Sequence, residues 1–519
     1  MIRIKEENKP LSTKVVRNVA FGGLRALLLA PVPFVMTPLI LSKIGTRGYG
    51  TWAVLVTMNS LTSLADLGLL GTLSKYVAEY NSCRDFVGLN RLLNTGLIVF
   101  LGLASLIVLI LRMFSSPLVH VLFRGSTSSS MELNYLFHCA LILIWINVMI
   151  FFSSSVTSGL QRLDLSNLLT AFNVLATSIT GAALLVLGWG VRGLLYANVI
   201  SSALTLLAYS WLLTRLLPEF VLSPLYVNNA EAKKIFGFSL QMYVTQAAAA
   251  IHNQLEKLLL ALLVGVVPVG WYDIAGDVAL KMRSVPQLLL GPVLPAASEL
   301  DAKGERTKLV DLYYRTHKYL AFVGVPLTFF AVAVSRRFVD LWIGRDLEVI
   351  AMPLAVLLVV GFFNLTTGPG YFIFAGQGIL RPGMYSALLG LGLNIPLSAI
   401  LIYVFGFSGA VFGTSISLIS ASVFFLYLFH HQTKLSFARL LRDAYLKPVV
   451  YSATLVLLLF AITPASAPSW LGLGLEASAF GVLYLGLLLF TKFFDVYDWD
   501  KMEGLLPIVR LARRAVPVA

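Results

Sequence analysis

The sequence predicts an all-α integral membrane protein with about fourteen transmembrane helices, and three observations carry that prediction. Hydrophobic residues make up 58% of the 519 residues and charged residues only 12%, with a mean hydropathy of +0.84. An average soluble domain has roughly 25% charged residues. Apolar runs of about 18 or more residues recur along the chain, and Lys and Arg gather in alternate loops between them.

The apolar runs place the helices in order. An α-helix needs about 20 mostly apolar residues to cross the hydrocarbon core of a bilayer. Several runs contain Gly, Pro and Ser, which membrane helices tolerate better than soluble helices do. The predicted spans are 15–40, 49–71, 92–114, 133–155, 166–188, 192–215, 236–264, 269–296, 316–335, 348–376, 383–405, 409–430, 446–463 and 470–492.

The loop charges predict the orientation. Fourteen spans place both termini on one side of the membrane, and the tails and loops of that side hold 27 of the 39 Lys and Arg residues. The opposite loops hold 8, and 4 lie deep inside spans, where residues within about three positions of a span end are counted with the adjoining loop. Because cytoplasmic loops carry the excess of basic residues, both termini are predicted to be cytoplasmic. The net charge of +14 therefore indicates membrane orientation rather than nucleic-acid binding.

An internal repeat divides the predicted spans. At an offset of 220, Gly45, Gly50 and Glu79 meet Gly265, Gly270 and Glu299, and at an offset of 216, Gln161 and Gly190 meet Gln377 and Gly406. The offset maps spans 1–6 onto spans 7–12. Parallel repeats of this kind are a known transporter plan, with the substrate path between the halves. The alternative is that stacked helical hairpins look alike without any symmetry.

The repeat predicts three domains. They are a six-helix lobe at 1–220, a parallel six-helix lobe at 221–432, and two additional transmembrane helices with a cytoplasmic tail at 433–519.

Sequence blocks along nearly the whole chain carry a family resemblance. They are IGTRGYGTWAV followed by ADLGLLGTLSKYVAEY, then GLQRLDLSN, and in the second half LEKLLLALLVGVVPVGWYDIA, LLGPVLPAASEL and FVDLWIG. The chain resembles the bacterial polysaccharide flippases of the Wzx type. These belong to the multidrug/oligosaccharidyl-lipid/polysaccharide superfamily, which includes the lipid II flippases and the MATE exporters.

The resemblance implies a function and partners. Two six-helix lobes would surround a central cavity and work by alternating access. The expected activity is the translocation of an undecaprenyl-diphosphate-linked oligosaccharide, an O-antigen or exopolysaccharide repeat unit, from the inner to the outer leaflet of the bacterial cytoplasmic membrane. The expected partners are this substrate, membrane lipids and polysaccharide polymerase or assembly proteins. Neither a metal nor another cofactor is expected, although a proton or sodium gradient is a possible energy source.

Ionisable residues inside predicted spans are the candidate site residues, because each costs about 2.5–3.5 kcal/mol to insert and normally faces a cavity or a partner. The candidate cavity cations for an anionic substrate are Arg25, Lys257, Lys281 and Arg283. Candidate ion-coupling residues are Asp66, His252, Glu256, Asp273 and Asp277. For most of them, the alternative is a salt bridge that packs one helix against another.

Two other function classes were weighed. A MATE-like exporter of organic cations should carry an acid in the first span, where this chain has Arg25. A membrane glycosyltransferase or polymerase should carry catalytic residues in a large outer loop, and no outer loop exceeds about 20 residues. The sequence also contains no GxxxxGK[ST], HExxH, GxSxG or CxxC motif. An enzyme is therefore not expected.

Overall fold

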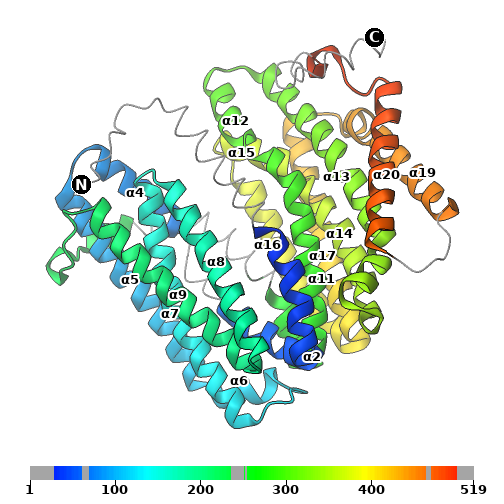
Figure 1. Cartoon of the computed structure of the whole chain (residues 1–519). Helices are drawn as coiled ribbons and strands as arrows, with labels where there is room; N and C mark the ends of the chain where they lie inside the picture. The colour runs from blue at the N-terminus through cyan, green and yellow to red at the C-terminus, as the bar shows by residue number, and fades with distance from the viewer. Residues whose placement is uncertain (1–28, 61–68, 235–250, 252–253, 463–468, 500–519) are drawn as a thin grey trace. The chain divides into compact units, whose positions relative to one another are not determined.

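The structure is a computed structural model that describes residues 29–60, 69–234, 251, 254–462 and 469–499. Every regular element within these ranges is a helix (Figure 1), which confirms the all-α prediction. Ten helical segments in the described ranges are long and apolar enough to cross a membrane. They coincide with the third to sixth and the ninth to fourteenth predicted spans, so the chain is a multi-pass membrane protein.

These segments come from both halves of the chain. They are α5 (Phe86–Met113), α7 (Ser130–Gly159), α8 (Leu163–Val186), α9 (Gly190–Leu216), α13 (Arg306–Ile343), the run of η3 (Arg345–Ile350), α14 (Ala351–Leu365) and α15 (Gly368–Gly376), then α16 (Arg381–Phe405), α17 (Phe407–Thr433), the run of α18 (Phe437–Leu440), η4 (Leu441–Tyr445) and α19 (Leu446–Ile462), and α20 (Trp470–Phe490).

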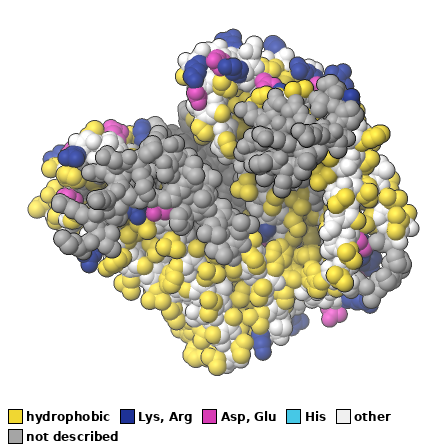
Figure 2. All heavy atoms as spheres, turned by 45° about the horizontal axis from the view of Figure 1, so that its top comes forward, with side chains coloured by type: hydrophobic (Ala, Val, Ile, Leu, Met, Phe, Trp, Pro, Cys, Tyr) yellow, Lys and Arg dark blue, Asp and Glu magenta, His cyan; other side chains and the backbone are white. Residues whose placement is uncertain are grey.

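The outer faces of these helices suit a lipid environment. Val186 on α8, Leu207 on α9 and Val482 on α20 are 62%, 65% and 70% exposed. In the view of Figure 2, hydrophobic side chains cover much of the described surface, and charged side chains lie mostly toward its edges. Large apolar surfaces of this extent are not found on soluble monomers, whose largest patch is roughly 300–600 Å².

Three of the remaining predicted spans lie partly outside the described residues. α2 (Pro31–Ser60) contains the end of the first predicted span, the predicted loop and the start of the second. The chain turns there within the helix at Gly45, whose φ of 66° is open to glycine. The predicted loop is thus a one-residue interruption. α4 (Leu69–Ser82) then follows, and helical residues 254–263 belong to the seventh predicted span.

The eighth predicted span, 269–296, differs from the prediction. The helix there is α11 (Val266–Gln287), which is followed by η2 (Leu288–Leu290) and α12 (Val293–Ala302). α11 is not among the ten apolar segments, because its 22 residues include four charged side chains. A helix this polar at membrane depth is a candidate for lining a cavity.

The chain forms two compact units. Unit 1 comprises the described residues up to Asp273 together with Leu391–Gly413, and unit 2 comprises Ile274–Gly390 with the described residues from Thr414. In unit 1, α8 packs against α9, and α7 packs against α4, α5 and α9 (Figure 1). In unit 2, α13 packs against α14, α19 and α20, and α12 packs against α15. The lobes predicted at 1–220 and 221–432 stay a prediction.

Several glycines that the predicted repeat pairs have similar backbone conformations, while the repeat itself stays a prediction. Gly45 and Gly265 both have positive φ, as do Gly190 and Gly406 at 57° and 58°. Two further counterparts, Gly50 and Gly270, meet inside unit 1, where a side chain on Gly270 would press on the Gly50 backbone. Close contact between equivalent residues is what a two-fold axis produces. Glycine is needed here for close packing of α2 against α11.

Candidate functional site

The site predicted from the sequence can be traced for six of its nine residues. Arg25, Asp66 and His252 lie outside the described residues. Glu256 and Lys257 lie on the helical residues 254–263, and the other four lie on α11: Asp273, Asp277, Lys281 and Arg283. The structure brings some of them together with polar residues that the sequence did not single out.

In unit 1, Lys257 and Asp273 form an ion pair. The Lys257 Nζ lies 2.6 Å from Asp273 Oδ1, and the two side chains are 16% and 20% exposed. The Tyr49 hydroxyl donates a hydrogen bond of 3.1 Å to the other carboxylate oxygen of Asp273. α2, the helix at 254–263 and α11 therefore meet at one carboxylate. In this conformation the charge of Lys257 is neutralised, which reduces its availability as a free cation for a substrate.

Glu256 is placed by a different partner. Its side chain is 1% exposed and accepts a hydrogen bond of 2.6 Å from Asn394 Nδ2 on α16, which also donates to Ser398 at 3.3 Å. A buried carboxylate is costly unless a cation or several donors compensate it. No cation is paired with Glu256 among the described residues. A buried acid with a neutral hydrogen-bond donor as its described partner is a candidate for ion coupling.

Arg283 has a buried nitrogen without a partner among the described residues. Its side chain lies partly buried in unit 2 beside Met282, Leu327 and Phe362, and its Nε has no hydrogen-bond partner among the described residues. No ion pair forms there with any described carboxylate, and the same holds for Lys281, two residues earlier on α11. A guanidinium with open donors in apolar surroundings can bind a phosphate or carboxylate through two parallel hydrogen bonds.

Asp277 lies one turn after Asp273 on α11 and is half-buried, with polar contacts of its own.

The sequence did not single out three further residues that contact the candidate site, namely Tyr49, Asn394 and Ser398. Asn394 could have been noticed, because an amide inside the apolar run 383–405 must find a partner. Tyr49 gave no such signal, since tyrosines near span ends are usual.

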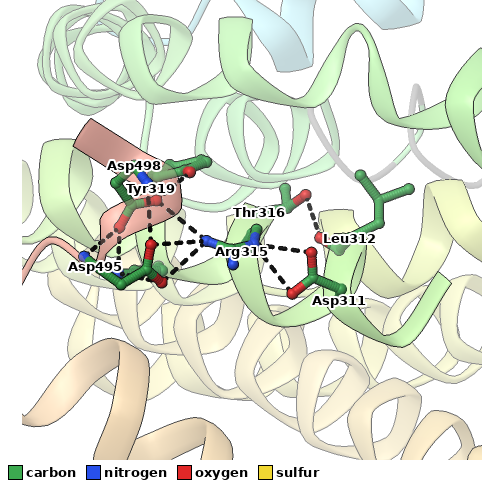
Figure 3. A network of polar contacts seen from close by, with 8 residues as sticks. Asp311, Leu312, Arg315, Thr316, Tyr319, Asp495 and Asp498 are labelled. Atoms are coloured by element: carbon green, nitrogen blue, oxygen red, sulfur yellow. Dashed lines mark hydrogen bonds and ion pairs between the residues drawn. The ribbon is translucent and has the colours of Figure 1, made fainter. Parts of the chain in front are cut away.

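A second polar cluster lies at the start of α13 and beyond the end of α20 (Figure 3). Arg315 contacts Asp311, Asp495 and Asp498 at 2.8, 3.1 and 3.2 Å. Lys318 pairs with Asp498, which is 2% exposed, and the Tyr319 hydroxyl donates to it at 2.5 Å. At the other end of α13, Arg337 pairs with Glu476 of α20 at 2.7 Å. These contacts fasten α20 and the segment after it to α13.

Among the described residues, no group of three or more His, Cys, Asp or Glu side chains could hold a metal ion. The described candidate residues offer charge and hydrogen bonding: unit 1 holds the Lys257–Asp273 pair and the buried Glu256, and unit 2 holds Arg283.

Comparison with known proteins identifies relatives by sequence. Residues 15–300 match the family described as "Polysaccharide biosynthesis protein". The chain is 19% identical over 398 residues to a protein of Shigella flexneri described as a putative O-antigen transporter. The aligned region covers 74% of this chain and 90% of the relative.

Comparison with solved structures identifies the fold. A lipid II flippase, MurJ, in an inward closed conformation superposes with a TM-score of 0.72 at 12% identity, covering 91% of this chain and 98% of that chain. An inward-facing MATE family multidrug resistance transporter of the MOP superfamily gives a TM-score of 0.60 at 16% identity, covering 78% and 94%. The chain shares the fold of these transporters.

Proposed function

The chain belongs to the polysaccharide biosynthesis protein family of the multidrug/oligosaccharidyl-lipid/polysaccharide superfamily, and on this premise we propose that it translocates an undecaprenyl-diphosphate-linked oligosaccharide across the membrane. The transported unit is an O-antigen or exopolysaccharide repeat unit, which moves from the inner to the outer leaflet of the bacterial cytoplasmic membrane. The likeness to an O-antigen transporter and the shared fold with a lipid II flippase support this choice.

The observation that carries the proposal is Arg283. A guanidinium with an unpartnered Nε in apolar surroundings is costly to keep unless an anionic group joins it during the transport cycle. The diphosphate of the substrate is such a group. Lys281 on the same helix also has no ion pair among the described residues, but it projects from a different face of α11, two residues away.

The other candidate residues take secondary roles in this proposal. Arg25 is a further substrate cation. Lys257 contributes once its pair with Asp273 opens, and Asp277 tunes the charge of α11. Glu256 is the coupling acid, because its carboxylate is buried beside a single amide donor. His252 and Asp66 complete the coupling set.

The proposed architecture extends the ten described segments to fourteen spans. Both termini are cytoplasmic, two parallel six-helix lobes flank the substrate path, and α19 and α20 form the additional pair. Matching positive φ at Gly190 and Gly406, and the contact between Gly50 and Gly270, support the parallel repeat. The assembly partners are polysaccharide polymerase and related proteins.

Transport in proteoliposomes tests the proposal. The purified full chain is reconstituted with a fluorescent undecaprenyl-diphosphate oligosaccharide, and the fraction accessible to an external glycosidase is followed with time. We expect flipping that depends on the protein and is lost in Arg25→Ala and Arg283→Ala, while both Lys variants keep part of it. Flipping at the rate of empty vesicles for the wild-type protein contradicts the proposal.

Coupling is tested in the same vesicles under an imposed gradient. We expect an uncoupler to slow flipping, and Glu256→Gln to remove this sensitivity while preserving the contact with Asn394. Equal rates with and without both proton and sodium gradients contradict the coupling role of Glu256.

The alternative function is a MATE-like exporter of small molecules, which the shared fold also permits. It is disfavoured because the least compensated charges of α11 are cations, which repel cationic drugs. Gradient-driven uptake of an organic cation, unaffected by lipid-linked glycan, would favour the exporter. A membrane glycosyltransferase or polymerase is a weaker alternative, and release of product from a sugar donor would reveal it.

A further inference from the structure

Unit 2 contains a large apolar cavity that the proposed transport does not use. It has a volume of about 590 Å³ and lies between α13, α14, α17 and the run of α18, η4 and α19. Ligand sites in proteins typically have about 300–1,000 Å³, with mostly apolar walls and a few polar groups that orient the ligand. The size and lining of this cavity fit that description.

One polar atom in the wall has no partner. His317 lines the cavity and is 0% exposed, and its Nε2 makes no hydrogen bond among the described residues. Its Nδ1 lies 2.8 Å from the Tyr445 hydroxyl. The hydroxyls of Thr328 and Thr366, which also line the cavity, already donate to carbonyl oxygens of their own helices. A buried polar nitrogen without a partner is unfavourable, and a ligand in the cavity would supply the missing hydrogen bond.

The cavity is long and has a polar end. Its lining on α13 runs from His317 to Ala333, which is about 24 Å at the rise of an α-helix. Lys318, next to His317, belongs to the polar cluster with Asp498, whereas the far end is closed by apolar residues such as Phe460. The ligand therefore has a long apolar part and a hydrogen-bonding group at one end.

The wall at the polar end has an unusual backbone. η4 (Leu441–Tyr445) is a π-helical turn between α18 and α19, and such turns occur frequently at functional sites. Leu440, Leu441 and Tyr445 face the cavity. Arg439 and Arg442 of the same run are 59% and 74% exposed and share one carboxylate, Asp443, which leaves net positive charge beside the polar end.

We propose that this cavity, the acyl site, binds one acyl chain of a membrane phospholipid. Nδ1 of His317 is 2.8 Å from the Tyr445 hydroxyl, and in this proposal the hydroxyl donates to Nδ1 while Nε2 carries the proton and donates to the ester carbonyl of the chain. An uncharged acceptor is required, because a charged group would lose its hydration in these apolar walls. The lipid phosphate lies at the level of Arg439 and Arg442. The bound lipid thereby holds α19 against α13, whichever substrate the protein transports.

Photolabelling tests the acyl site. The full chain is reconstituted in vesicles of phosphatidylethanolamine and phosphatidylglycerol that contain a phosphatidylglycerol with a photoreactive acyl chain. We expect adducts to concentrate on residues 325–333 of α13 and 449–460 of α19. Val332→Trp, which fills the cavity, should reduce these adducts at least about fivefold, since it removes the volume for the chain. The control Val423→Trp, on an exposed position of α17, should leave them unchanged.

A variant of His317, at the polar end of the cavity, tests the proposed hydrogen bond to the ester carbonyl. His317→Phe keeps the ring volume and removes Nε2, and we expect about 2- to 10-fold fewer adducts at equal folding. If His317→Phe does not insert, Val332→Trp decides alone. Adducts spread evenly over lipid-facing helices, or unchanged in Val332→Trp, overturn the proposal. Displacement of the label by undecaprenyl phosphate but not by excess phospholipid also overturns it, because the carrier lipid would then be the occupant.

Discussion

Two arginines of unit 2 have opposite surroundings. Arg315 on α13 contacts three carboxylates, from Asp311, Asp495 and Asp498 (Figure 3). Arg283 on α11 has no ion pair among the described residues, and its Nε has no hydrogen-bond partner. Both side chains are largely removed from water. The same residue type therefore occurs once with three carboxylate partners and once with no ion pair in the part of the chain that the structure describes.

The different surroundings of Arg315 and Arg283 indicate a role in stability for the first and a role in substrate binding for the second. A charge whose partners are all supplied by the protein fixes one helix to another and leaves nothing for a ligand. A charge at membrane depth without partners costs free energy in the resting protein, and it persists where a ligand supplies the missing partner. By this reasoning the Arg315 cluster fastens the additional helix pair to α13, and Arg283 serves the substrate.

The largest expected effect is on stability, in the Arg315 cluster. Asp498→Asn removes a buried carboxylate and leaves Lys318 and Arg315 with fewer partners. Removing one partner of a buried pair costs about 3–5 kcal/mol. We expect a lower melting temperature in detergent, with transport per folded molecule unchanged. If Asp498→Asn melts normally but loses transport, the Arg315 cluster takes part in transport, and its contrast with Arg283 does not hold.

The next effect is on transport, at Arg283. A charge-assisted hydrogen bond contributes roughly 1.5–3 kcal/mol, which corresponds to about a tenfold to hundredfold change in affinity. Arg283→Ala should lower transport by that factor without lowering the melting temperature, because no described partner is lost. Asp498→Asn serves as the opposite control. A destabilised but fully active Arg283→Ala protein would give Arg283 a packing role.

The Lys257–Asp273 pair lies between these extremes. Lys257→Met leaves a partly buried carboxylate with only the Tyr49 hydroxyl, and we expect a loss of about 1–2 kcal/mol in stability. The double variant Lys257→Met, Asp273→Asn should recover most of it, as measured by thermal unfolding in a double-mutant cycle. If the pair is structural only, the double variant also transports normally. If Lys257 is a substrate cation, transport stays low at recovered stability.

The smallest effect concerns pH, at Asp495 beyond the end of α20. Burial acts to raise the pKa of this carboxyl, but the Asp498 backbone N–H, Lys318 and Arg315 hold the pKa below its ordinary value. A lowered pKa in the folded state gives stability that is present above about pH 3.9 and is lost as the pH falls through the folded value. Hydrogen exchange of residues 493–499 should accelerate only below that pH. Unchanged protection at pH 3 would contradict this.

Much of the fold could be predicted from the sequence. The apolar runs predicted ten segments that the structure describes as long apolar helices, including α13 and α20. The predicted span 269–296 is instead α11 followed by η2 and α12, because an apolar run reports hydropathy and not where the chain bends. The loop predicted before residue 49 is only an interruption at Gly45, since a glycine with positive φ can turn the chain within one residue.

The sequence predicted which charged residues belong to the candidate site, but not which residues they contact. Lys257, Asp273 and Arg283 could be identified from the sequence, because a charged residue within an apolar run is easily recognised. Whether each has a partner depends on residues far away in the chain, such as Tyr49 for Asp273. The contact between Glu256 and Asn394 joins residues 138 positions apart, which no local pattern reveals.

The most direct test of the central claim measures binding rather than transport. The affinity of the purified protein for an undecaprenyl-diphosphate oligosaccharide is determined for the wild type, Arg283→Ala and Arg283→Lys, each at verified folding. We expect binding by the wild type, about tenfold to hundredfold weaker binding by Arg283→Ala, and an intermediate affinity for Arg283→Lys. Equal affinity of all three proteins for this lipid would contradict the assignment of Arg283 to the substrate diphosphate.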